Sequence, residues 1–162
     1  NTHGQRRRIR HQSPLILMNP TEYLKQEQEL LASFPEKREM LELLVEYGKE
    51  LGDFPKAQEK EENSVPGCVS NVYITATNKA NKIHFQARSD SLIVRGYLFI
   101  ILKALDGLTA KEITDIQPVV EEFLKVTKIS ESTLHSRANA FGNIYRVMKE
   151  KAITLSKNAD AL

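Results

Sequence analysis

Two short segments in the middle of the chain alternate like β-strands, and this pair constrains the fold more than any other feature. The segment from Val69 to Thr77 is rich in β-branched and aromatic residues, and apolar side chains occupy every second position from Val72 to Ala76 and again from Ile83 to Ala87. Alternation with a period of two is typical of strands that bury one face. Residues 78–82 (NKANK) between them have the composition of a turn. The sequence therefore predicts an antiparallel hairpin.

Helical patterns flank this hairpin on both sides. Asn19 and Pro20 have the residue types of an N-cap and a first helical position, so a helix is expected from there towards Phe34. A second helix follows Pro35 and ends before the Gly52–Pro55 segment. Four more helices are expected downstream. The first runs from a cap at Ser89 or Asp90 to about Leu105, with Gly107 just beyond its end. The others begin at a capping box at Thr109, near Pro118, and at Ser132 or Leu134, and the last of them ends at Lys157.

The fold class that follows is α+β, with a small, mostly antiparallel sheet packed against α-helices. Because two strands alone make a marginal sheet, a third strand is expected within residues 53–66, where the periodicity is weak. A length of 162 residues suits one domain.

The first 18 residues are interpreted separately from the domain at residues 19–162. They contain Arg6, Arg7, Arg8 and Arg10 and no acid. Such a leader can be a remnant of recombinant expression, an organelle transit segment or a basic arm. Met18 resembles a native start, so we favour the remnant and expect the leader to lie outside the fold.

Composition excludes several classes of function. The first 12 residues hold four of the 23 Lys and Arg residues, so the rest of the chain has 19 basic and 21 acidic side chains, without the basic stripe of a nucleic-acid-binding protein. The longest apolar run, residues 96–102, is far shorter than the roughly 20 residues that span a membrane. One Cys and four His without ligand spacing predict no metal site and no iron–sulfur cluster.

Cys68, the single cysteine of the chain, is the candidate reactive residue. It follows Pro66-Gly67, a turn that favours exposure, and Ser70 with nearby amides could hydrogen-bond its sulfur. The alternatives are a small buried hydrophobic residue, an interaction module without chemistry, and a stand-alone Cys–His thiol enzyme. The histidine of such an enzyme would be His84 or His135.

Several motifs in series resemble the SufE family of sulfur acceptors. The segment PGCVSNVY (residues 66–73) resembles the family's GCxSxVW, and SDSLIVRG (residues 89–96) resembles its Ser-Asp followed by IV(K/R)G. The likeness extends to YGKEL at residues 47–51, TAKEI at residues 109–113 and SRANA at residues 136–140. It covers about Leu30 to Lys157, in order.

The resemblance implies a sulfur relay that needs a partner and no cofactor or metal of its own. Cys68 would accept persulfide sulfur from a pyridoxal-phosphate cysteine desulfurase of the SufS or CsdA type and stimulate that enzyme. The sulfur would then pass to an iron–sulfur scaffold such as SufBCD. The implied fold is the one shared with IscU-type scaffolds. A homodimer is left open. The implied compartment is the cytoplasm, or a plastid or mitochondrion if the leader is native.

The resemblance also implies which residues support Cys68. Gly67 would let the loop swing outward, and Arg137 and Asn139 would line the same surface, with Arg137 favouring the anionic sulfur. Asp90 is expected to cap a helix and to order the Cys68 loop.

The chain departs from the family pattern at four positions: Val69, Asn71, Tyr73 and Ala140. Tyr73 keeps an aromatic side chain, so the fold is not in question. Val69 and Asn71 flank the thiol, and these two changes put the identity of the partner in question more than the chemistry.

Overall fold

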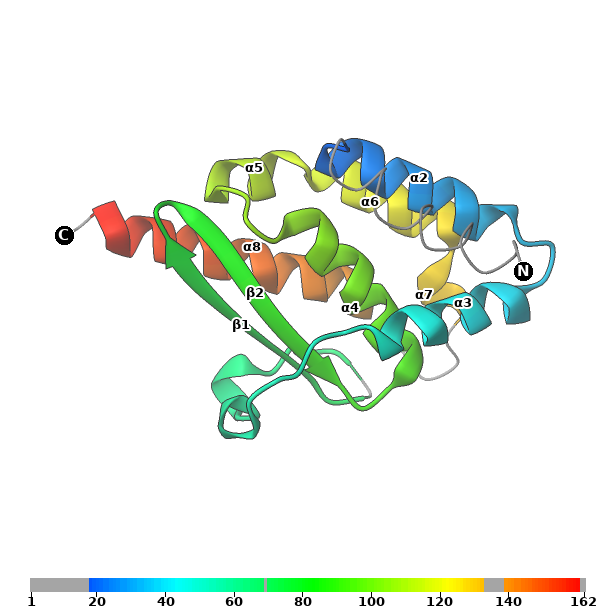
Figure 1. Cartoon of the computed structure of the whole chain (residues 1–162), viewed down its shortest axis with the longest axis horizontal. Helices are drawn as coiled ribbons and strands as arrows, with labels where there is room; N and C mark the ends of the chain where they lie inside the picture. The colour runs from blue at the N-terminus through cyan, green and yellow to red at the C-terminus, as the bar shows by residue number, and fades with distance from the viewer. Residues whose placement is uncertain (1–17, 69, 133–138, 161–162) are drawn as a thin grey trace, which may run out of the picture.

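The computed structural model describes residues 18–68, 70–132 and 139–160, and the fold is α+β as predicted. Helices α2 and α3 precede a two-stranded hairpin, and five further helices follow it (Figure 1). The elements are α2 (Pro20–Ser33), α3 (Lys37–Lys49), the 3₁₀ turns η1 (Lys56–Gln58) and η2 (Glu61–Asn63), β1 (Val72–Lys79), β2 (Lys82–Ser89), α4 (Leu92–Leu105), α5 (Ala110–Asp115), α6 (Gln117–Thr127), α7 (Ile129–Ser132) and α8 (Ala140–Asp160).

The hairpin pairs β1 with β2 in an antiparallel register that runs from Val72 opposite Ser89 to Lys79 opposite Lys82. Ala80 and Asn81 form the turn, both with positive φ. A two-residue turn of this kind matches the right-handed twist of the strands. The turn is therefore shorter than the expected 78–82 segment, and both strands extend further towards it.

One face of the hairpin is buried against α4 and α8. Ile74, Ile83 and Phe85 lie on that face and are nearly inaccessible to solvent. The Tyr97 ring of α4 meets the Phe141 ring of α8 edge to face, with centroids 4.8 Å apart. This geometry is favourable for aromatic pairs and joins the two helices beneath the sheet.

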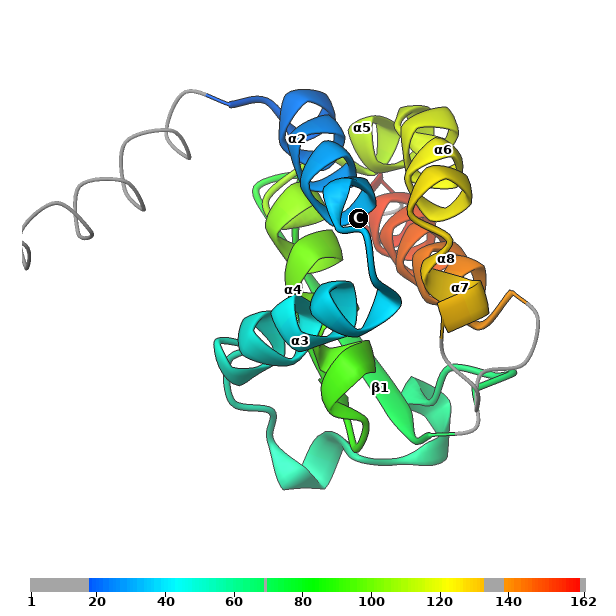
Figure 2. The ribbon, with the colours of Figure 1, turned by 90° about the vertical axis from the view of Figure 1, so that its right-hand side faces the viewer.

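Helices α2 and α6 form a further layer and lie side by side in both views (Figures 1 and 2). Tyr23, Leu24 and Leu31 of α2 enter the same hydrophobic core as Phe123 of α6. The buried hydrophobic residues of the described part of the chain thus form one continuous core.

Helices α3 and α4 cross at a very short distance because each has glycine at the contact. A Cβ at Gly48 would lie 2.7 Å from the Leu92 carbonyl oxygen, and a Cβ at Gly96 would overlap the Leu44 carbonyl. Real Cβ atoms do not approach backbone atoms so closely. Gly48 belongs to the YGKEL segment and Gly96 to the SDSLIVRG segment noted in the sequence. The packing of α3 on α4 explains why glycine stands at both positions.

Two helix boundaries were predicted wrongly. The α4 helix is capped by Ser91, whose hydroxyl accepts from the Val94 amide, and not by Ser89 or Asp90. The last helix begins at Ala140, after the separate short helix α7, and extends to Asp160. The caps at Asn19 and Thr109 and the position of Gly107 after α4 are confirmed.

The third strand expected within residues 53–66 does not form. That segment contains η1 and η2, followed by an isolated bridge between Ser64 and Tyr73. Its charged sequence favours short 3₁₀ turns, in which most side chains reach solvent and Asn63 alone is buried, over a strand with a buried face. The predicted leader falls outside the described residues except for Met18.

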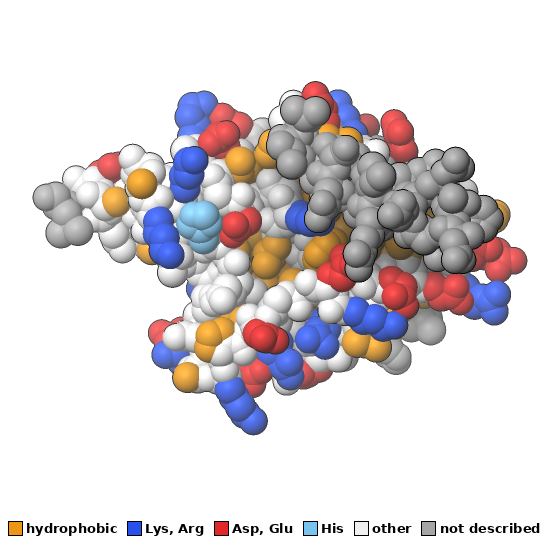
Figure 3. All heavy atoms as spheres, in the orientation of Figure 1, with side chains coloured by type: hydrophobic (Ala, Val, Ile, Leu, Met, Phe, Trp, Pro, Cys, Tyr) orange, Lys and Arg blue, Asp and Glu red, His pale blue; other side chains and the backbone are white. Residues whose placement is uncertain are grey.

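Within the described ranges, no helix has the length and apolar character needed to cross a membrane. On the face seen in Figure 3, acidic and basic side chains are interspersed.

We predict that Gly96→Ala destabilises the fold and that Gly142→Ala does not. The first change forces α3 away from α4, which costs about 2–4 kcal/mol of unfolding free energy. A Cβ at Gly142 meets nothing within 4 Å, and alanine is the better helix former, so the change there is between zero and about 1 kcal/mol of stabilisation. Urea denaturation measures both. Equal stability of the two variants would contradict the proposed crossing.

Candidate functional site

Cys68 lies in a loop that is tied together at its base. The Val65 amide donates to the Val72 carbonyl over 2.9 Å, and Ser64 bridges Tyr73, so residues 66–71 leave the sheet and return at almost the same place. The thiol is therefore presented by a short loop at the open end of the hairpin, opposite the turn at residues 80–81.

The Cys68 side chain is half-buried in the observed conformation. It packs against the hydrophobic core, and its Sγ lies 3.9 Å from the carbonyl oxygen of Ala140, in the first turn of α8. Burial raises the pKa of the Cys68 thiol above its usual range. Because a carbonyl oxygen accepts a hydrogen bond from S–H and repels a thiolate, this position favours the protonated thiol.

On the N-terminal side of Cys68, the loop approaches α8 closely. Gly67 has φ +83°, a left-handed conformation that favours glycine. The Asn143 side chain donates to the Pro66 carbonyl over 3.2 Å. The sequence analysis did not identify Asn143, which lies 77 positions from Pro66 and belongs to no chemical motif.

On the C-terminal side, a polar chain links the loop to the end of the hairpin. The Asn71 side chain donates to Asp90 over 3.0 Å, and the Asp90 amide donates to the Asn71 carbonyl. Asp90 also accepts from Arg88, which in turn pairs with Glu59. Asp90 thus contacts the segment that follows Cys68. Arg88 and Glu59 were not identified from the sequence.

The remaining predicted residues fall into two groups. Ser70 is half-buried in the loop, and Asn139 is exposed with φ +72° immediately before α8. Asn139 therefore lies next to Ala140, the residue that contacts the sulfur. Arg137 and His135 lie outside the described residues, as does Val69.

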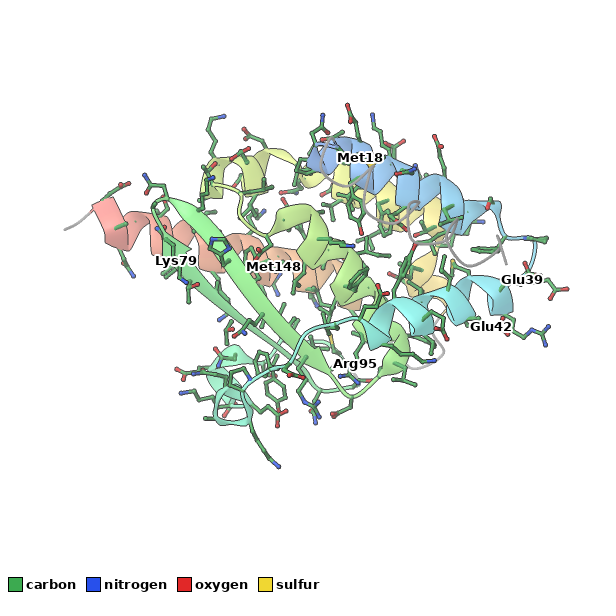
Figure 4. The ribbon with its side chains drawn as sticks, in the orientation of Figure 1. Met18, Glu39, Glu42, Lys79, Arg95 and Met148 are labelled. Atoms are coloured by element: carbon green, nitrogen blue, oxygen red, sulfur yellow. The ribbon has the colours of Figure 1, made fainter. Side chains whose placement is uncertain are left out.

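His84 is remote from Cys68. The register pairs His84 with Thr77, five residues along β1 from Val72, which corresponds to roughly 17 Å of strand. In Figure 4, Lys79 marks the turn of the hairpin and Arg95 lies near its opposite end. His84 contacts Asp106 at 3.2 Å instead. The geometry does not make His84 the base of a Cys–His pair.

No group of three or more His, Cys, Asp or Glu side chains able to hold a metal ion occurs among residues 18–68, 70–132 and 139–160. The site is therefore a single thiol on a tied loop, sheltered by the first turn of α8.

Comparison with known proteins identifies the family. The model of the "SufE: Fe-S metabolism associated domain" matches residues 25–152. The chain belongs to the SufE family. It is 40% identical over 119 residues to an uncharacterized SufE-like protein of Synechocystis, covering 74% of this chain and 72% of that protein.

Two further relatives carry more specific names. The "Cysteine desulfuration protein SufE" of Plasmodium falciparum is 30% identical over 151 residues, covering 88% of this chain and 58% of its own length. The "SufE-like protein 1, chloroplastic/mitochondrial" of Arabidopsis thaliana is 32% identical over 127 residues, covering 78% of this chain. This SufE-family chain spans only 33% of the Arabidopsis protein.

A solved structure supports the fold independently. The solution structure of a hypothetical protein from Thermus thermophilus superposes with a TM-score of 0.66 at 18% identity. The match covers 86% of this chain and 99% of that one. At this identity the likeness concerns the fold of the SufE-family chain.

We predict that alkylation of Cys68 is slow near neutral pH and accelerates with a midpoint above that of an unfolded cysteine, which is roughly 8.5. Burial raises the pKa of the native thiol, so less thiolate is present at a given pH. Iodoacetamide rates measured from pH 6 to 10, with urea-unfolded protein as the control, test this.

The raised pKa of the Cys68 thiol also determines the direction in which the stability of the protein changes with pH. Above about pH 8.5 the unfolded chain releases the Cys68 proton before the native one, so this thiol makes the protein less stable as pH rises. A native midpoint at or below that of the unfolded chain would contradict the sheltered position.

Proposed function

We propose that this protein is a sulfur carrier whose Cys68 accepts persulfide sulfur from a pyridoxal-phosphate cysteine desulfurase of the SufS or CsdA type. Membership of the SufE family supports a role in iron–sulfur metabolism. The observation that carries the proposal is the placement of the one cysteine of the chain on a tied, half-buried loop at the surface.

The chemistry needs only a thiolate and access. The Cys68 thiolate attacks the terminal sulfur of the desulfurase persulfide, so a new S–S bond forms on Cys68 and the old S–S bond breaks. The desulfurase cysteine leaves as a thiolate, and the terminal sulfur keeps its proton. Nothing is oxidised or reduced overall. Removal of the persulfide frees the desulfurase for another turnover, which is how the carrier stimulates it.

The sheltered conformation suits a carrier between transfers. A persulfide exposed to solvent would exchange with other thiols, and the half-buried site beside Ala140 limits that exchange. Transfer requires the sulfur to leave this position, and the freedom of Gly67 supports such a movement. Arg137 and Asn139 are proposed to line the surface that meets the partner.

The downstream acceptor is proposed to be an iron–sulfur scaffold such as SufBCD. A single thiol cannot supply the several thiolates that hold a cluster, so the protein is proposed to deliver sulfur and not clusters. The proposed compartment is the cytoplasm. A plastid or mitochondrion is the alternative, since the Arabidopsis relative is named chloroplastic/mitochondrial.

A stand-alone Cys–His thiol enzyme is the second candidate function. Because His84 is remote from Cys68, the base of such an enzyme would be His135. It differs from the carrier in needing no partner protein. Loss of a partner-independent activity in His135→Ala would favour it over the relay.

The relay predicts a Cys68-dependent gain of mass. Incubation with a SufS-type desulfurase and cysteine should add roughly 32 Da for each sulfur atom to the intact chain, and Cys68→Ser should abolish both the gain and the stimulation of the desulfurase. Because serine is nearly isosteric, binding to the desulfurase should persist in the variant. Ser33→Ala, at the exposed end of α2, is the control variant outside the site. An unchanged mass of the parent protein, with the desulfurase shown to turn over, would refute the relay.

A further inference from the structure

The first two turns of α8 touch the Cys68 loop at two points. The Ala140 carbonyl lies 3.9 Å from Cys68 Sγ, and the Asn143 side-chain amide donates to the Pro66 carbonyl over 3.2 Å. Both contacts join the loop to a helix more than 70 residues away in the sequence. Movement of the sulfur out of its sheltered position breaks the first contact, and movement of the whole loop away from α8 breaks both.

The Asn143 side chain lies in the space where a side chain of Gly67 would stand. A Cβ at Gly67 would lie 2.6 Å from Asn143 Nδ2, closer than real Cβ atoms approach a neighbour. The φ of +83° is what favours glycine here, and a Cβ at this position would also require the Asn143 amide to shift. The Asn143 amide therefore lies directly against the backbone of the loop.

Asn143 also has contacts on its own helix. Its backbone amide donates to the Asn139 carbonyl over 2.8 Å, and its Oδ1 accepts from Arg146 over 3.5 Å. Arg146 also pairs with Glu150 at 3.1 Å. A side chain in this place must accept from Arg146 and donate to Pro66, and a carboxamide does both, whereas an ionised carboxylate has no donor.

We infer that Asn143 is a positioning residue that holds the Cys68 loop closed against α8 and sets how often the thiol is presented for sulfur transfer. The inference rests on the proposed function for its biological meaning. One exposed hydrogen bond biases a local equilibrium by a factor of roughly two to ten. Such a bias protects the sulfur at rest and is small enough for a docking partner to overcome.

The test measures Cys68 alkylation by iodoacetamide in the folded protein without any partner. Because the chain has one cysteine, the rate reports this site alone. Asn143→Ala should react roughly two- to ten-fold faster at pH 7.5, with its pH midpoint shifted down towards that of a free thiol. Asn143→Ser, which is too short to reach Pro66, should behave in the same way and guards against a folding defect in one variant.

Tyr145→Phe is the matched control. It deletes another side-chain donor of α8, the hydroxyl that reaches the Ile113 carbonyl over 2.6 Å, on the face away from the loop. If Asn143 acts through the loop, Tyr145→Phe leaves the alkylation rate unchanged. Equal acceleration in Tyr145→Phe, or no acceleration in the two Asn143 variants, would overturn the inference.

A second readout separates positioning from loss of structure. With a SufS-type desulfurase, Asn143→Ala should lower the concentration that gives half-maximal stimulation and leave the maximal rate unchanged, because less binding energy goes into opening the loop. A higher half-maximal concentration overturns the inference. The alkylation test needs no desulfurase, so failure of the relay and failure of the Asn143 contact are distinguishable.

Discussion

The close crossing of α3 and α4 is the constraint on which the geometry of the site depends. Because Gly48 and Gly96 stand at the contact, the two helix backbones lie so close together that a Cβ at either position would clash with the facing helix. Helix α4 begins only three residues after β2 ends, so its position fixes the open end of the hairpin. The loop that carries Cys68 starts and finishes at that end. Packing of α3 on α4 thus helps to determine where the sulfur lies.

Helix α8 combines a structural and a functional part along one continuous element. Its middle turns bury Ile144 and Met148 in the core beneath the hairpin (Figure 4), whereas its first turn meets the Cys68 loop through Ala140. The buried part includes Phe141 in the first turn and holds the helix against the core, and the Cys68 loop meets this end of the helix through the Ala140 and Asn143 contacts. Because these two contacts are separate from the packing of Phe141, Ile144 and Met148, opening of the loop would leave the helix in place.

Much of the fold follows from local patterns, and the failures have physical causes. The hairpin and the caps at Asn19 and Thr109 depend on neighbouring residues alone, and the sequence predicted them. The α4 cap was misplaced because Ser89, Asp90 and Ser91 are all good capping residues, and only the tertiary path of the chain selects the last. No third strand was needed, since α4 and α8 cover the buried face of the hairpin. Cys68 was found from chemistry, but Asn143 could not be, because its partner is distant in sequence.

The hydrogen bond from the Val65 amide to the Val72 carbonyl closes the base of the Cys68 loop through backbone atoms alone. The residues between these two groups also make contacts outside the loop: Cys68 packs against the core, the Pro66 carbonyl accepts from Asn143, and Asn71 donates to Asp90. Exchange of the loop residues therefore changes how the loop is held against α8 and the end of β2, whereas the pairing at its base persists. If the sulfur moves as proposed, the number of residues between the paired groups limits how far it can reach.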